Sequence, residues 1–103
     1  MEIITQGQTL ELSGDFDVRS TGQVRHAIYQ HLGSLTEANV VIDLTGVRYV
    51  DVTALRVLAV ATMEATRQGH HLTLRGCGPA IRRMLHISRL IRVVEVEREA
   101  ATA

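Results

Sequence analysis

The stretch from Val40 to Gln68 constrains the fold most, because a short apolar run there leads through a turn into a long helical pattern. Residues 40–42 are Val, Val and Ile, and a short β-branched run between polar residues is typical of a strand buried on both faces. We therefore predict the central strand of a sheet here, ending at Asp43. The Leu-Thr-Gly sequence at 44–46 predicts a turn in which Gly46 takes a positive φ angle.

After a brief apolar step, the second half of this stretch predicts an amphipathic helix that begins just beyond Asp51. A carboxylate there can accept hydrogen bonds from the free N–H groups of the first turn, so we predict Asp51 as the N-cap. Thr53 would then lie in the first turn, where the helix dipole and the unpaired amides favour negative charge. Six residues at i, i+3, i+4 spacing form the predicted core face: Leu55, Leu58, Ala59, Thr62, Ala65 and Thr66.

Opposite this core face, four residues fall within a narrow arc of the same helix: Arg56, Val60, Met63 and Arg67. Two apolar residues between two arginines make a strip suited to a protein partner. The alternative is that Val60 and Met63 contact a neighbouring helix, or are scattered apolar residues of an ordinary surface. We favour the partner interpretation as a hypothesis.

The first third of the chain predicts a β-hairpin followed by a helix. Apolar residues on both sides of Gln6–Gln8 indicate two antiparallel strands, and residues 13–17 predict a turn that ends the second one. Either Asp17 or Ser20 can cap the helix that follows. Five residues form the core face of that helix: Val24, Ala27, Ile28, His31 and Leu32.

The last third predicts a strand over residues 70–75, a third helix and a final strand from Ile91 to Val96. Pro79 suits the first position of the third helix, because no backbone N–H is needed there. Residues 97–103 are expected to fray. The order β-β-α-β-α-β-α-β implies right-handed crossovers and parallel pairing after the hairpin, so we predict one α/β domain over 1–103 with a mixed β-sheet and covering helices.

Composition narrows the possible functions. The 103 residues contain 11 basic residues, all arginine, against 11 carboxylates, so no basic field argues for nucleic acid or an anionic membrane as partner. The lack of lysine excludes a phosphate-loop lysine and a Schiff base. No apolar run approaches the roughly 20 residues of a bilayer span, and no signal-peptide pattern opens the chain, so we expect a cytoplasmic location.

The residues that could hold a metal ion do not form a recognisable set. His70 and His71 are neighbours on a predicted strand, so their side chains point to opposite faces. Cys77 with either histidine gives two ligands, fewer than a zinc site needs. Neither a nucleophile elbow nor a cofactor fingerprint is present, so we predict no metal, no cofactor and no enzymatic activity.

Asp15 and Asp17 follow the second strand at its carboxyl end, where open α/β sheets build their sites. They are therefore candidates for contact with a partner. The alternative is that they form a turn and a helix cap.

Three segments of the chain resemble the STAS domain family, specifically its small stand-alone anti-sigma factor antagonists. Residues 14–17 (Gly-Asp-Phe-Asp) resemble the G-E-L-D segment of the family. Residues 41–55 resemble its strand, turn and D-S-[ST]-G-L phosphorylation loop. Residues 77–85, together with 90–92, resemble its third helix and the entry to its last strand.

The resemblance implies a protein that works by partner switching. In that family an unphosphorylated antagonist binds an anti-sigma factor, itself a serine/threonine kinase, and frees the sigma factor; phosphorylation of the loop breaks the complex and a phosphatase restores it. The resemblance thus implies that Thr53 is the phosphoacceptor and that Asp51 and Val52 contact the partner beside it. The alternative for Thr53 is a threonine that only fills the first helical turn.

The chain differs from the family motif at three positions around Thr53: Val52 replaces a hydroxyl residue, Ala54 replaces glycine, and Arg56 stands where a second glycine is common. These differences favour an alternative function. In it, the domain is a scaffold or sensor that binds without being phosphorylated, within a larger regulatory assembly.

Overall fold

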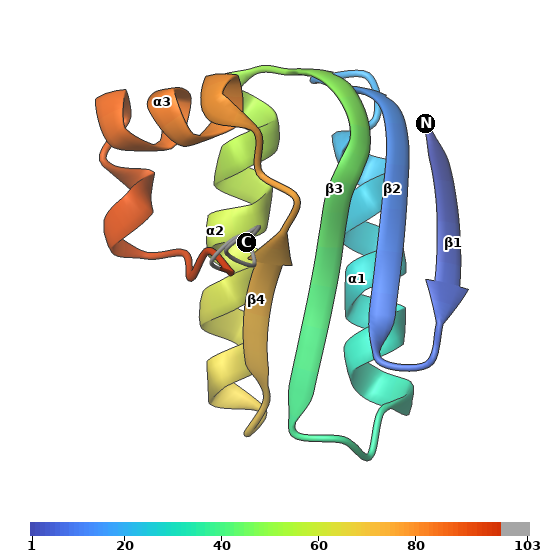
Figure 1. Cartoon of the computed structure of the whole chain (residues 1–103). Coiled ribbons are helices and arrows are strands. Elements are labelled where there is room, and N and C mark those ends of the chain that lie inside the picture. Colours follow the sequence, from blue (N-terminus) through green and yellow to red (C-terminus); the bar gives the residue numbers. More distant parts are fainter. Residues whose placement is uncertain (98–103) are drawn as a thin grey trace, which may run out of the picture.

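A four-stranded sheet in the order β1-β2-β3-β4 forms the centre of the molecule, in a computed structural model that describes residues 1–97 (Figure 1). The elements are β1 (Glu2–Gln6), β2 (Thr9–Phe16), α1 (Thr21–Ser34), β3 (Asn39–Val50), α2 (Val52–Arg67), β4 (His71–Arg75), α3 (Pro79–Ile87) and the 3-10 helix η1 (Leu90–Arg92). β1 pairs antiparallel with β2, whereas β2, β3 and β4 run parallel. The mixed sheet with an opening hairpin and covering helices is confirmed.

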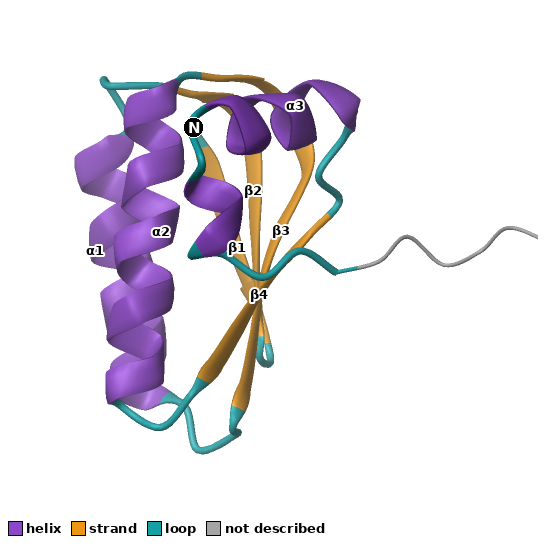
Figure 2. Cartoon of the chain, turned by 90° about the vertical axis from the view of Figure 1, so that its left-hand side faces the viewer, coloured by secondary structure: helices purple, strands orange, loops and turns teal. Residues whose placement is uncertain are grey.

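The core lies between one face of the sheet and the helices α1 and α2, which lie side by side across it (Figure 2). Alternate residues of each strand point into this layer, as the period of two in a strand requires. The largest fully buried side chains are Phe16, Leu10, Leu12, Ile28, Leu32, Ile42, Leu44, Leu55, Leu58, Leu72, Leu74 and Leu85. The 40–42 segment is buried and central as predicted, because β3 has a partner strand on each side.

β3 is longer than predicted, and the turn expected at 44–46 is wrong. The strand continues through this segment to Val50, and β2 likewise continues through the turn expected at 13–17, so that Phe16 pairs with Val50. Two register shifts between the strands take up the irregularity. Gly46 does not take a positive φ; a Cβ atom there would lie 2.8 Å from the Cβ of Ser13, so glycine permits the close approach of the two strands.

The final strand predicted from Ile91 to Val96 is wrong. The chain instead turns at Arg89, which has a φ of 66°, and forms η1, with the N–H groups of Val93 and Val94 donating to the carbonyl of Leu90. Only Val96 forms a bridge with β4, at Leu74. A helical turn is favoured over a strand here because it lets Val94 enter the core. The apolar residues before Val94 then pack beside α3.

Two smaller predictions have different outcomes. Thr66 is exposed, so it does not belong to the core face of α2, although the other five residues predicted for that face are buried. Residues 98–103, most of the segment expected to fray, lie outside the described residues.

Gly76 provides a test of how α3 is held against β3. Its φ is 73°, and a Cβ atom there would overlap the hydroxyl of Thr45 and lie 2.8 Å from the backbone nitrogen of Thr45. Gly76→Ala is expected to destabilise the fold by about 3 kcal/mol, through backbone strain and overpacking, in urea denaturation.

Gly33 is the matched control, because it lies in α1 and no atom beyond its chain neighbours and the backbone of the helix lies within 4 Å of the added Cβ. Gly33→Ala is expected to be neutral or to stabilise by up to about 1 kcal/mol. Equal stability of Gly76→Ala and the wild type would contradict this account.

Candidate partner-binding site

Asp51 connects two segments of the chain at the carboxyl end of the sheet. One carboxylate oxygen, Oδ1, accepts a hydrogen bond of 2.8 Å from the N–H of Ala54, which confirms the predicted N-cap of α2. The other, Oδ2, accepts 3.1 Å from the N–H of Val18 in the loop between β2 and α1. This second bond spans 33 residues and has no local sequence signal. The carboxylate therefore ties that loop to the first turn of α2.

Thr53 is exposed in the first turn of α2, as predicted. The next residue, Ala54, is fully buried, so the turn is anchored directly beside it. No acidic residue lies in this first turn. The hydroxyl of Thr53 thus lies at a helix N-terminus that has no negative side chain in its first turn. Such a position accommodates negative charge well.

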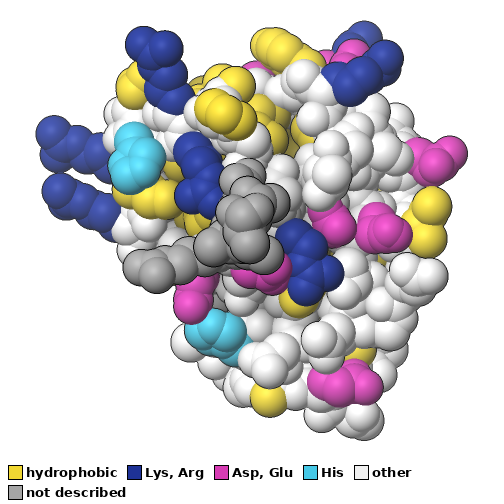
Figure 3. All heavy atoms as spheres, in the orientation of Figure 1, with side chains coloured by type: hydrophobic (Ala, Val, Ile, Leu, Met, Phe, Trp, Pro, Cys, Tyr) yellow, Lys and Arg dark blue, Asp and Glu magenta, His cyan; other side chains and the backbone are white. Residues whose placement is uncertain are grey.

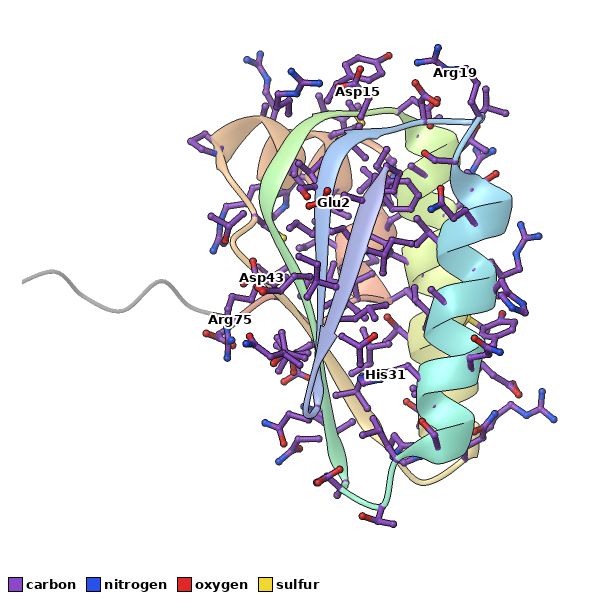
Figure 4. All side chains as sticks on the ribbon, turned by 90° about the vertical axis from the view of Figure 1, so that its right-hand side faces the viewer. Glu2, Asp15, Arg19, His31, Asp43 and Arg75 are labelled. Carbon is purple, nitrogen blue, oxygen red and sulfur yellow. The ribbon has the colours of Figure 1, made fainter. Side chains whose placement is uncertain are left out.

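Asp15 and Asp17 follow one another at the end of β2 but have different surroundings. Figure 4 shows Asp15 and Arg19, the residue that pairs with Asp17, at the same end of the molecule. Asp17 is buried and accepts three hydrogen bonds from Arg19: 2.9 Å from the backbone nitrogen, 3.2 Å from Nε and 2.7 Å from Nη2. These bonds from Arg19 hold the pKa of the Asp17 carboxyl below its ordinary value, so it stays ionised in mild acid. Asp15 is half exposed, with Arg48 at 3.7 Å.

These contacts favour the alternative interpretation for Asp17, as a residue that shapes its own turn. Ser20, not Asp17, precedes the first residue of α1. Its hydroxyl accepts from the N–H of Asp17 at 3.2 Å and makes no side-chain cap to the helix. Asp15 keeps a more accessible carboxylate, and its contact with a partner stays a prediction.

The strip on α2 is exposed along its whole length, since Arg56, Val60, Met63 and Arg67 are all accessible. Val60 is 54% exposed and Met63 is 56% exposed, so more than half of each residue is open to solvent. At 1.5 Å per residue, the exposed side of α2 from Thr53 to Arg67 extends about 21 Å. The hydroxyl and the strip thus share one continuous face, and whether this face binds a partner stays a prediction.

Other classes of site find little support in residues 1–97. No three metal-ligating side chains come together in this part of the chain. Cys77 is buried, and burial raises the pKa of its thiol, which disfavours the reactive thiolate. None of the described helices has the length and apolar character that crossing a membrane requires.

The described residues form a small α/β module with an exposed helix N-terminus at the carboxyl end of its sheet. The chain belongs to the STAS domain family, because the family model described as "Mlab, STAS domain" matches residues 2–95. A STAS-domain containing protein of Pseudomonas aeruginosa (strain UCBPP-PA14) is 28% identical over 91 residues, which are 88% of each chain.

Two solved structures share the fold at low sequence identity. An anti-sigma factor antagonist from Mycobacterium paratuberculosis superposes with a TM-score of 0.78 and 20% identity, covering 95% of this chain and 84% of that one. The Bacillus cell fate determinant SpoIIAA in its phosphorylated form superposes with a TM-score of 0.66 and 15% identity, covering 95% and 91%.

The double role of Asp51 can be tested by substitution. Asp51→Ala removes both the cap and the bond to Val18, so it is expected to destabilise the fold by about 2 kcal/mol in urea denaturation. The amide hydrogens of Val18 and Ala54 should also exchange faster. Asp51→Asn keeps one acceptor oxygen and should cost about half as much.

Asp15→Ala is the matched control, because the half-exposed ion pair of Asp15 is worth little; its change should stay within about 0.5 kcal/mol. If Asp51→Ala were no less stable than this control, Asp51 would not join the two segments.

Proposed function

We propose that this chain is an anti-sigma factor antagonist, which binds an anti-sigma factor through the N-terminus and the exposed face of α2. The observation that carries the proposal is the position of the accessible Thr53 hydroxyl at one end of the strip formed by Arg56, Val60, Met63 and Arg67. Two relatives in fold support it: one is an anti-sigma factor antagonist, and SpoIIAA has a phosphorylated form.

Phosphorylation of Thr53 would act on binding and leave the fold intact. The phosphate adds about −1.5 to −2 charges, which the N-terminus of α2 stabilises within the folded domain. The same charge stands beside the Asp51 carboxylate and would have to be desolvated against the partner, so repulsion and desolvation would weaken the complex by a few kcal/mol. The partner in this scheme is a serine/threonine kinase, and a phosphatase reverses the modification.

A second candidate function is a STAS scaffold or sensor that binds without modification. The observation that favours it is the altered motif around Thr53, in which Val52, Ala54 and Arg56 stand where the family has a hydroxyl residue and glycines. In this second function the exposed face of α2 binds permanently, as one part of a larger regulatory assembly.

Charge reversal on the α2 strip tests the binding surface that both candidate functions use. Arg56→Glu is expected to weaken binding to the purified anti-sigma factor at least about tenfold in isothermal titration calorimetry, because the substitution replaces a positive charge of the contact by a carboxylate. The melting temperature should not change, because Arg56 is exposed and makes no bond that the fold needs.

Arg25→Glu is the matched control, since Arg25 is also an exposed arginine, on α1. It should bind as the wild type does. If Arg56→Glu and Arg25→Glu had equal affinity, the α2 strip would not be the binding surface.

A further inference from the structure

A groove runs between the carboxyl half of β3 and the helix α3. Its walls include Val47 and Tyr49 from β3, and Pro79, Ala80, Ile81 and Met84 from α3. The groove encloses about 430 Å³. It continues past Pro79, Ala80 and Met84 into a more open hollow that Arg83 and Ile87 complete. Together they form one apolar surface, which we call the β3–α3 groove.

Large apolar side chains lie exposed along this groove. Tyr49 is 55% exposed and Ile87 is 74% exposed, whereas the face of α3 toward the core buries Ile81 and Leu85. No element within residues 1–97 covers the groove, since its lining residues belong to β3, α3 and the turn before α3 alone. A contiguous apolar surface of this kind is typical of an interaction site.

The charged side chains of the segment that contains α3 and η1 are all positive. Residues 76–94 contain four arginines and no carboxylate, although the chain as a whole balances 11 basic against 11 acidic residues. The four are Arg82, Arg83, Arg89 and Arg92. Figure 3 shows basic side chains gathered over α3 and η1, while acidic ones are spread over the open face of the sheet. A net charge of zero therefore conceals a locally positive surface.

Arginines also lie within the groove itself. Arg48 lines it on the β3 side, and Arg83 lines the hollow on the α3 side. The Arg48 side chain is 79% exposed, and its contact with Asp15 is long, at 3.7 Å. Of the described residues that line the groove and the hollow, none is acidic. Both guanidinium groups are therefore placed to form ion pairs with carboxylates of a binding partner.

The shape favours a protein segment over other anionic partners. The groove is concave and apolar, and it has the volume of a few large side chains, which suits anchoring residues of a peptide. A bilayer would meet a hollow here instead of a projecting apolar face. Nucleic acid would find two arginines among apolar walls, too few for a phosphate-binding surface.

We propose that the β3–α3 groove binds an acidic segment of a protein partner, with a large apolar side chain in the groove and carboxylates paired with Arg48 and Arg83. This site is separate from the α2 strip and does not depend on phosphorylation of Thr53. It would give the domain a second protein contact.

Selection from a displayed library of random peptides of about twelve residues tests this proposal on the full chain. Enriched peptides should combine two or more carboxylates with Leu, Ile, Phe or Trp. In fluorescence anisotropy their affinity should fall about tenfold or more for Arg83→Glu, and should weaken as NaCl rises from about 50 to about 500 mM. Ile87→Ser should weaken binding without affecting folding, since Ile87 projects into solvent.

The control is again Arg25→Glu, on α1, which should bind these peptides as the wild type does. Enrichment of peptides without carboxylates, no enrichment at all, or equal effects of Arg83→Glu and Arg25→Glu would overturn the proposal. So would binding to vesicles of anionic lipid in place of peptides. Self-association in sedimentation that Arg83→Glu abolishes would assign the groove to a second copy of the chain.

Discussion

The Asp51 carboxylate is the interaction on which the geometry of the candidate site depends. Its two oxygens accept from the N–H groups of Val18 and Ala54, so one side chain fixes both the loop after β2 and the first turn of α2. Thr53 lies inside that first turn and is held through it. A hydroxyl on a fixed turn offers a binding partner or a kinase one well-defined geometry, with little ordering entropy to lose.

The parallel pairing of β2 and β3 explains why this single residue can reach both segments. Phe16 pairs with Val50, so β2 and β3 end side by side. The loop after β2 and the helix α2 after β3 therefore begin at the same end of the sheet. Beyond β4, the close approach of Gly76 to Thr45 holds the start of α3 near β3 and so defines the β3–α3 groove. The same sheet therefore positions two exposed surfaces, one on α2 and one beside α3.

The sequence predicts those parts of this arrangement that depend on local chemistry. Asp51 is recognisable as an N-cap because the cap bond reaches only three residues ahead, and helical periodicity alone places Arg56 and Met63 on the exposed side of α2. The bond to Val18 spans 33 residues and has no local signal. The prediction of a final strand is wrong because it, too, considers only local residues. The apolar, β-branched residues after Arg89 suit a strand, but packing beside α3 favours a helical turn.

The most direct test of the account is to incubate the chain with its anti-sigma kinase and ATP and to locate any phosphate by mass spectrometry. Thr53→Ala is the test variant, and Thr66→Ala, an exposed threonine at the other end of α2, is its control. We predict one phosphate on Thr53, absent in Thr53→Ala and present in Thr66→Ala, with release of the partner and an unchanged fold. A stable complex with no phosphate on Thr53, or phosphate on another residue, would contradict the switch.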